Sequence, residues 1–216
     1  MEKQSDVWLE TEGNNWFARN GEFLGKKNDI ASSILDIYGI KPRRALEIGC
    51  ANGFRLAALN ERFGTAVTGV DPSVKALEDG KKKYPNVRLM RGMAESFVLE
   101  EKFDLVIVNF VFHWVGRDVL LKAAANADGC VEDGGFLLIG DFGTENFLRR
   151  SYHHVKDGGM YTYKQRYQDM FISSGSYREI ARLTFNHDRY ELSADTDSSN
   201  IGTICLLRKI PVYTDV

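Results

Sequence analysis

The sequence contains little proline and cysteine, and its charges nearly cancel. Its 216 residues include 4 prolines and 3 cysteines, and the formal net charge is −2. Cys50, Cys130 and Cys205 are odd in number and form no C-x-x-C pair, which is typical of free thiols in a reducing compartment and argues against a metal site. The balanced charge argues against an extended nucleic-acid surface.

Long apolar runs and targeting segments are also missing. No run approaches the ~18 apolar residues of a membrane span, and Met1–Asp6 lacks the basic and then apolar layout of a signal peptide. We therefore expect a cytoplasmic protein without a membrane partner. No proline-, glycine- or serine-rich linker and no internal repeat divides the chain, so residues 1–216 are expected to form a single domain.

The sequence does contain a regular alternation of short apolar runs and helical patterns. Apolar runs predict strands at residues 44–48, 66–70, 87–90, 105–110, 136–139, 182–185 and 203–207. Helical periodicity predicts helices at residues 28–38, 54–63, 73–84, 119–127 and 164–173. This order predicts an α/β fold, a doubly wound and mostly parallel seven-stranded sheet with helices on both faces.

One stretch carries most of the functional information. Residues 45–48 are an apolar run that leads into a turn containing Gly49 and Gly53, and a second run ends at Asp71. Parallel strands bring such a turn and such an acid to one edge of the sheet, where they can bind a cofactor that contains a nucleoside. The alternative is a glycine turn in an unrelated domain, with Asp71 capping the helix that begins at Pro72–Ser73.

The glycine spacing distinguishes between cofactors. In the dinucleotide pattern G-x-G-x-x-G the third glycine would fall at Phe54, which argues against NAD. The pattern instead resembles motif I of the class I S-adenosylmethionine-dependent methyltransferases, acid-x-Gly-x-Gly-x-Gly. Glu47 matches the acid, Gly49 and Gly53 match two glycines, and Ala51 replaces the middle glycine.

Two later stretches strengthen this resemblance. Residues 103–110 (Phe-Asp-Leu-Val-Ile-Val-Asn-Phe) are similar to motif IV of that family, and residues 134–140 are similar to the Gly-Gly-x-Leu-x-Ile strand that follows it. The resemblance implies an S-adenosylmethionine-binding domain whose last strand is antiparallel to its neighbours. It also implies N-terminal cap helices within residues 1–40 and a substrate lid at residues 142–175.

The resemblance assigns cofactor contacts to individual residues. Asp71 is expected to bind the ribose hydroxyls, and Asn109 to contact the methionine end. Ala94 and Glu95 are expected at the adenine, and the glycine turn along the amino-acid portion. The full set of expected cofactor-binding residues is Glu47, Gly49, Cys50, Ala51, Gly53, Asp71, Pro72, Ala94, Glu95 and Asn109.

Two histidines are the candidates for catalysis. His113 follows the predicted strand at residues 105–110 and can serve as a general base for an oxygen nucleophile, the alternative being a structural histidine. His154, within the expected lid, is the second candidate. From Arg149 to Arg189 eight Lys/Arg residues stand against four acids, which indicates an anionic acceptor unless these charges form a solvated face.

The expected function is methyl transfer from S-adenosylmethionine to a small-molecule acceptor, with oxygen as the first choice for the accepting atom. The sequence lacks the Asn/Asp-Pro-Pro-Tyr/Phe stretch of enzymes that methylate exocyclic base amines, so no nucleic-acid partner is expected. The alternatives are methyl transfer to a protein or an RNA, and a catalytically inactive S-adenosylmethionine-binding scaffold. The oligomeric state cannot be read from the sequence.

Overall fold

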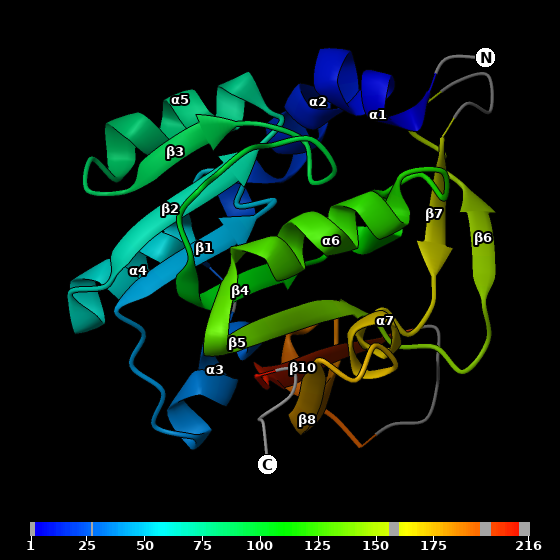
Figure 1. Cartoon of the computed structure of the whole chain (residues 1–216). Coiled ribbons are helices and arrows are strands. Elements are labelled where there is room, and N and C mark those ends of the chain that lie inside the picture. Colours follow the sequence, from blue (N-terminus) through cyan, green and yellow to red (C-terminus); the bar gives the residue numbers. More distant parts are fainter. Residues whose placement is uncertain (1–2, 27, 156–159, 195–199, 212–216) are drawn as a thin grey trace.

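An eight-stranded sheet forms the centre of the molecule (Figure 1). The computed structural model describes residues 3–26, 28–155, 160–194 and 200–211. The strand order in the sheet is β3-β2-β1-β4-β5-β10-β8-β9. In chain order, the strands of this sheet are β1 (Arg44–Ile48), β2 (Ala66–Asp71), β3 (Arg88–Arg91), β4 (Phe103–Asn109), β5 (Val131–Phe142), β8 (Tyr177–Asn186), β9 (Glu191–Leu192) and β10 (Ile201–Lys209).

The first five strands are parallel. β1 pairs with β2 on one side and with β4 on the other, and β3 and β5 extend the sheet outward from these. The run Leu105–Val108 in β4 is buried throughout. Such a continuous apolar strand is stable because helices cover both faces of a parallel sheet. The predicted α/β class and its mostly parallel sheet are confirmed.

The C-terminal strands agree with the expected topology and add one strand. β10 is antiparallel to both β5 and β8, as the family resemblance implied. The prediction of seven strands is short by one, because β9 pairs with β8 at the sheet edge. β9 has only two residues, Glu191 and Leu192, and both are exposed, so no periodic pattern could mark it.

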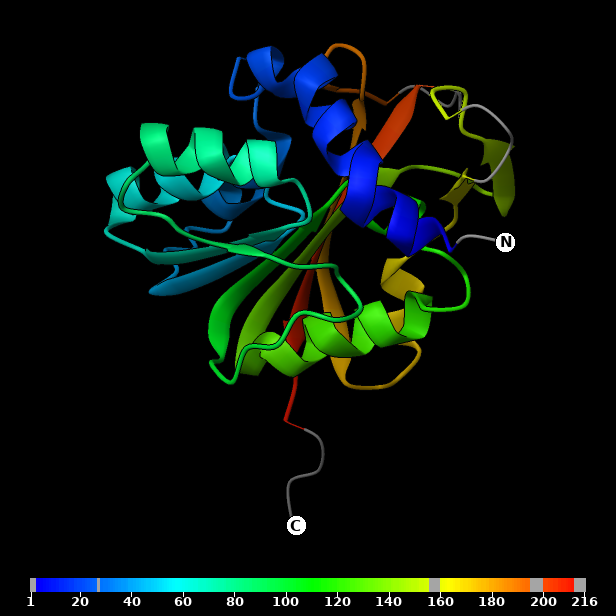
Figure 2. The same ribbon diagram turned by 90° about the horizontal axis from the view of Figure 1, so that it is seen from above.

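Helices form a layer on each face of the sheet (Figure 2). The first layer consists of α3 (Ile30–Ile37), α4 (Phe54–Phe63) and α5 (Val74–Lys83), whose apolar residues share one core cluster. The second consists of α6 (Leu120–Cys130) and α7 (Gln168–Ile172), which pack on the opposite face. None of the helices in the described ranges has both the length and the apolar character needed to cross a membrane.

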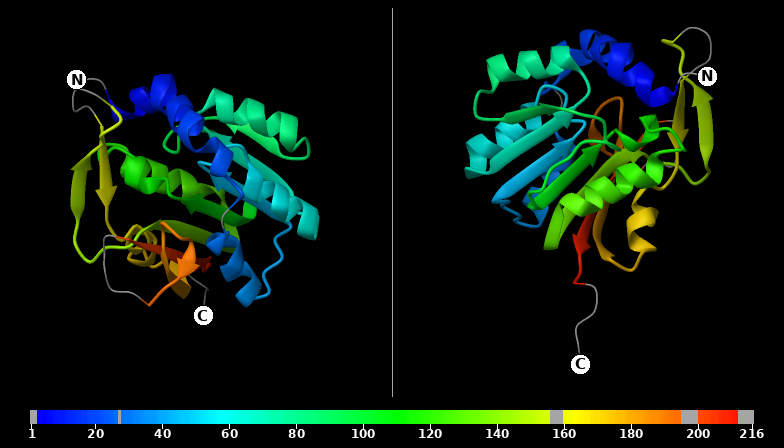
Figure 3. Two further views of the ribbon diagram at one scale, coloured as in Figure 1. Left: turned by 180° about the vertical axis from the view of Figure 1, so that it is seen from behind. Right: turned by 45° about the horizontal axis from the view of Figure 1, so that its top comes forward.

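The N-terminal segment lies across one end of the sheet, between α5 and a hairpin (Figure 3). It consists of α1 (Gln4–Val7), a π-helical turn (Trp8–Glu12), α2 (Gly13–Asn20) and a 3-10 turn (Gly21–Phe23). On one side, Oδ1 of Asn14 accepts hydrogen bonds from the Ser73 hydroxyl (3.0 Å) and the Lys75 N–H (3.1 Å). On the other, the Gln4 amide donates to the Tyr161 carbonyl (2.8 Å) and accepts from the Tyr161 N–H (3.0 Å).

The hairpin occupies the region where the lid was expected. β6 (Leu148–Ser151) and β7 (Tyr161–Lys164) pair antiparallel and form a separate two-stranded sheet. The helix predicted at residues 164–173 is the shorter α7. Residues 156–159 of the expected lid lie outside the described residues.

Candidate active site

The turn after β1 depends on glycine at its first position. Gly49 has a φ of +74°, and a Cβ on it would come within 2.2 Å of Cγ2 of Val111. The N–H groups of Gly49 and Cys50 both donate to the carbonyl of Val70 in β2, at 2.7 and 3.1 Å. The turn is therefore folded tightly against β2 and the segment after β4, and a side chain on Gly49 would disturb it.

Ala51 adopts a backbone conformation that favours glycine. Its φ is +50°, a left-handed value that a residue with a Cβ rarely adopts. Its N–H donates to Oδ2 of Asp71 at 2.8 Å, and this bond compensates part of the strain. The turn from β1 and the acid at the end of β2 thus form one hydrogen-bonded unit.

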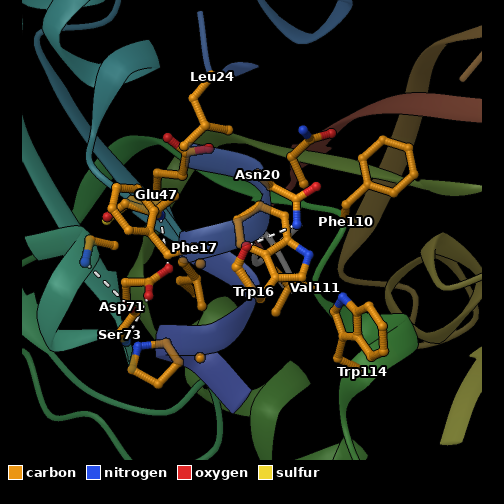
Figure 4. A pocket seen from close by; sticks show the side chains of 18 of the residues that line it. Trp16, Phe17, Asn20, Leu24, Glu47, Asp71, Ser73, Phe110, Val111 and Trp114 are labelled. Carbon is orange, nitrogen blue, oxygen red and sulfur yellow. Dashed lines mark hydrogen bonds between the residues drawn. The ribbon is translucent and has the colours of Figure 1, made fainter. Parts of the chain in front are cut away.

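A cavity of about 280 Å³ lies beside this unit, at the carboxyl ends of β1, β2 and β4 (Figure 4). The chain reverses its winding direction between β1 and β4, which is where doubly wound sheets bind ligands. Of the residues expected to bind a cofactor, all except Gly53 line the cavity. These are Glu47, Gly49, Cys50, Ala51, Asp71, Pro72, Ala94, Glu95 and Asn109.

Asp71 has acceptor capacity left for a ligand. Each of its oxygens already accepts one backbone N–H, from Ala51 and from Ser73, both at 2.8 Å. A carboxylate oxygen has two lone pairs, so each can accept one more bond. Burial raises the pKa of Asp71 to about 6, against the opposing effect of these two N–H donors. The N-terminus of α5 is capped by the Ser73 hydroxyl, which accepts the Ala76 N–H at 3.1 Å.

Glu47 belongs to a buried ionic network. Arg55 on α4 donates from Nε to both oxygens of Asp29, at 3.0 and 2.9 Å, and from a terminal nitrogen to Oε1 of Glu47. Burial raises the pKa of Glu47 to about 7, although Arg55 opposes this shift. Oε2 of Glu47 is buried without a hydrogen-bond partner among the described residues. A buried acceptor of this kind needs a donor, which a cationic ligand group would supply.

Asn109, at the end of β4, carries a second buried acceptor of this kind. Its Oδ1 has no hydrogen-bond partner in the described part of the chain. Gly140 on β5 makes room for this amide, since a Cβ there would lie 2.0 Å from Oδ1. Glu95 differs, because its Oε1 already accepts the Ser5 hydroxyl at 2.5 Å.

Neither candidate catalytic histidine lines the cavity. His113 is 2% exposed, and its ring packs on Trp114 (4.6 Å between centroids) and Phe142 (4.8 Å). Its backbone N–H donates to Oδ2 of Asp141 at 3.2 Å, and Nδ1 lies 3.0 Å from Oδ1 at an angle unsuited to a hydrogen bond. His154 is exposed on the hairpin, its ring 5.3 Å from that of Tyr152.

An aromatic cluster, Phe110, Trp114 and Phe142, separates His113 from the cavity. Phe110 and Trp114 line the cavity, and the Phe110 ring packs edge-on against Phe142 at 5.2 Å. Phe110 has a φ of +56°, an uncommon value for a bulky residue. This turn in the backbone directs the chain after β4 around the cavity, as strained residues at functional sites often do.

Sequence reasoning missed several residues that line the cavity. Asp29, Arg55 and Tyr190 are the clearest cases. The signal for Arg55 is its spacing in α4. It lies four residues before Leu59 on the buried face of the helix, where a charged side chain needs a partner. No local pattern marks Tyr190, which reaches the cavity from the segment between β8 and β9.

The doubly wound sheet, the antiparallel β10 and the tight turn at Gly49 define the class I methyltransferase fold. A family model described as "Methyltransferase domain" matches residues 45–135. This part of the chain is therefore similar to a methyltransferase domain, and it lies in a sheet of Rossmann-like topology.

Known proteins with similar sequences are also methyltransferases by name. An uncharacterized methyltransferase from Alkaliphilus oremlandii is 25% identical over 82% of this chain and 90% of its own length. Malonyl-(acyl-carrier protein) O-methyltransferase from Priestia megaterium is 34% identical over 51% of this chain, and the match spans only 42% of that enzyme.

Similarity in structure extends over nearly the whole chain. The 1,6-didemethyltoxoflavin-N1-methyltransferase of Burkholderia thailandensis, solved with 1,6-didemethyltoxoflavin and S-adenosylhomocysteine, superposes with a TM-score of 0.74. The superposition covers 98% of this chain and 92% of that one, at 15% sequence identity. At this identity the likeness shows a common fold.

The Gly49→Ala variant tests the turn. The left-handed φ and the contact with Val111 together are expected to lower the free energy of unfolding by about 3 kcal/mol. Gly64→Ala is the matched control, because Gly64 has a φ of +69° and no neighbouring atom within 4 Å of the position that a Cβ would take. It should lose only about 1 kcal/mol. Urea unfolding measures both, and equal losses would contradict the role of the Val111 contact.

The raised pKa values predict a pH dependence of stability. The folded protein holds protons on Glu47 (pKa about 7) and Asp71 (pKa about 6) that the unfolded chain releases near pH ~4. These groups therefore favour the folded state at low pH, and this contribution is lost as the pH rises through about 6 to 7. The Tm of the ligand-free protein should depend less on pH between about 5.5 and 8 in Glu47→Gln than in the wild type. Parallel Tm profiles of the variant and the wild type would contradict a raised pKa at Glu47.

Proposed function

We propose that the protein transfers a methyl group from S-adenosylmethionine to a small-molecule acceptor, at an oxygen atom. The observation that carries the proposal is the group of acceptors around one cavity. Each oxygen of Asp71 keeps a lone pair, and Glu47 and Asn109 each have a buried oxygen without a hydrogen-bond partner in the described structure. They suit a ligand with neighbouring hydroxyls and an ammonium group. The family match and the fold support the same cofactor.

Each part of the cofactor has a fitting group in the cavity. Asp71 would accept bonds from the ribose hydroxyls, and Oε2 of Glu47 would accept a bond from the ammonium of the methionine part. Ala94 and Glu95 would lie at the adenine. The turn at Gly49 would lie along the amino-acid portion, because no side chain intrudes there.

The charge around the cavity also suits a sulfonium. The carboxylates of Asp29, Glu47, Asp71 and Glu95 line it together with the guanidinium of Arg55. Aromatic residues on its border include Trp16 and Trp114, whose ring faces attract a positive charge. An excess of negative groups and aromatic faces favours a cationic ligand over a pyrophosphate.

The cofactor supplies an activated methyl group for an in-line displacement, so the protein mainly has to align the acceptor. Phe110 and Trp114 border the cavity beyond Asn109 and offer flat surfaces that restrict how an acceptor can lie. The relative from Priestia megaterium is named as an O-methyltransferase, which supports oxygen as the accepting atom. A carboxylate acceptor is already a nucleophile and needs no base, whereas an alcohol or phenol needs one.

Cofactor binding is tested with S-adenosylhomocysteine and NAD by calorimetry. The wild type should bind S-adenosylhomocysteine and not NAD. Asp71→Ala should weaken this binding by about 1.5–3 kcal/mol, because charge-assisted hydrogen bonds are lost. Asp169→Asn is the control, since Asp169 pairs with Arg166 on the surface. Unchanged affinity in Asp71→Ala would remove the ribose assignment.

The role of His113 as a general base is tested with the variant His113→Ala. If His113 acts on an alcohol or phenol acceptor, turnover should fall at least about tenfold while the affinity for S-adenosylhomocysteine stays the same.

The acceptor class for this assay is identified by labelling. A cell extract is incubated with the protein and a labelled methyl donor, and its metabolites and macromolecules are then separated. Label in protein or RNA, or no transfer at all, would overturn a small-molecule acceptor. An unchanged rate would leave His113 a structural role.

A further inference from the structure

The hairpin carries a largely buried lysine whose ammonium has no counter-ion in the described structure. Lys164, the last residue of β7, is 8% exposed, and its Nζ lies 4.2 Å from the centre of the Phe142 ring. Among the described residues it has no hydrogen bond, and no carboxylate oxygen lies within 4.0 Å of it. The apolar stem of Lys164 is thus buried, whereas its Nζ is not among the fully buried unpaired atoms and stays accessible to an anion.

A second cation lies on the same face of the hairpin. Arg150 pairs in register with Thr162, and Leu148 pairs with Lys164, so the side chains of Arg150 and Lys164 are diagonal neighbours. Burial and the charge of Arg150 both lower the pKa of Lys164. Arg150 is exposed and forms no ion pair in the described part of the chain. The repulsion between these two cations favours a bound anion.

Asp141 is the acid whose charge acts on Lys164, and both of its oxygens already accept hydrogen bonds. Its Oδ1 accepts the Phe142 N–H at 2.8 Å, and its Oδ2 accepts the His113 N–H at 3.2 Å. Asp141 raises the pKa of Lys164, but burial and the charge of Arg150 lower it by more, so the net shift is downward. Asp141 therefore does not neutralise the pair.

The cation pair lies next to the active-site cavity. Lys164 contacts one side of the aromatic cluster through Phe142, and the Phe142 ring contacts Phe110, which lines the cavity. The hairpin is also joined to the N-terminal segment that covers the cavity, through Gln4 and Tyr161. An acceptor that reaches past Phe110 would bring its far end to the two cations.

We propose that Lys164 and Arg150 bind an anionic group, a carboxylate or a phosphate, of the methyl acceptor. The anion supplies the missing counter-charge, and Phe110 and Phe142 separate it from the reacting atom. The acceptor is thus an acidic small molecule with an apolar or planar part between its two ends. This inference rests on the proposed function, because it assumes that the cavity holds the methyl donor.

The test compares three variants of the full chain. Lys164→Met keeps the length of the stem without the charge, and Arg150→Gln removes the second cation. Arg149→Gln is the matched control, because Arg149 lies on the opposite face of the same strand and stacks on Tyr161 at 4.6 Å. The probes are citrate for carboxylates and inorganic phosphate for phosphates, each titrated in a thermal-shift assay with S-adenosylhomocysteine present.

At least one probe should raise the Tm of the wild type, and the one effective at lower concentration identifies the anion. Lys164→Met and Arg150→Gln should each need at least about tenfold more of it, and Arg149→Gln the same amount as the wild type. No Tm rise with either probe, or an equal loss in Arg149→Gln, would overturn the proposal. Arg150→Gln keeps the test valid if Lys164→Met fails to fold.

Binding of S-adenosylhomocysteine separates this inference from the proposed function. All three variants should bind it as tightly as the wild type, since none of the three residues lines the cavity. If the wild type does not bind it, the proposed function fails. If the wild type binds it and the anion response does not depend on Lys164 and Arg150, only the acidic acceptor is refuted.

Discussion

The hydrogen bond from the Ala51 N–H to Asp71 is the constraint on which the site depends. It joins the turn after β1 to the end of β2 and holds Ala51 in a left-handed conformation that its Cβ disfavours. It also fixes the orientation of the carboxylate, because Ser73 holds the other oxygen. The acid that is proposed to recognise the ribose is thus part of the turn that shapes the cavity.

Burial of charge is the second organising feature. Glu47 is 1% exposed and Arg55 is 7% exposed, and their interaction with Asp29 links α4 to the segment before α3. Removing one member of such a network leaves an uncompensated charge in a low dielectric. Arg55 opposes the effect of burial on the pKa of Glu47, and a cationic ligand would lower that pKa further.

Much of the fold could be predicted from the sequence, because the parallel strands are continuous apolar runs and Gly49 and Asp71 are local signals at strand ends. The prediction missed β9, which has no pattern, and the network of Asp29 with Arg55, whose partners are distant in sequence. The placement of His113 depends on Phe110. A positive φ at a phenylalanine has no signature in the sequence, and it turns the chain so that the imidazole lies behind the aromatic cluster.

The N-terminal segment is held at two points, by Asn14 near α5 and by Gln4 at β7. Trp8, between these two attachments, and Trp16 and Phe17, just after Asn14, form part of the cavity lining. A ligand in this cavity would lie against a segment that is held at two points, so the freedom of that wall to move depends on how firmly Gln4 and Asn14 are bound.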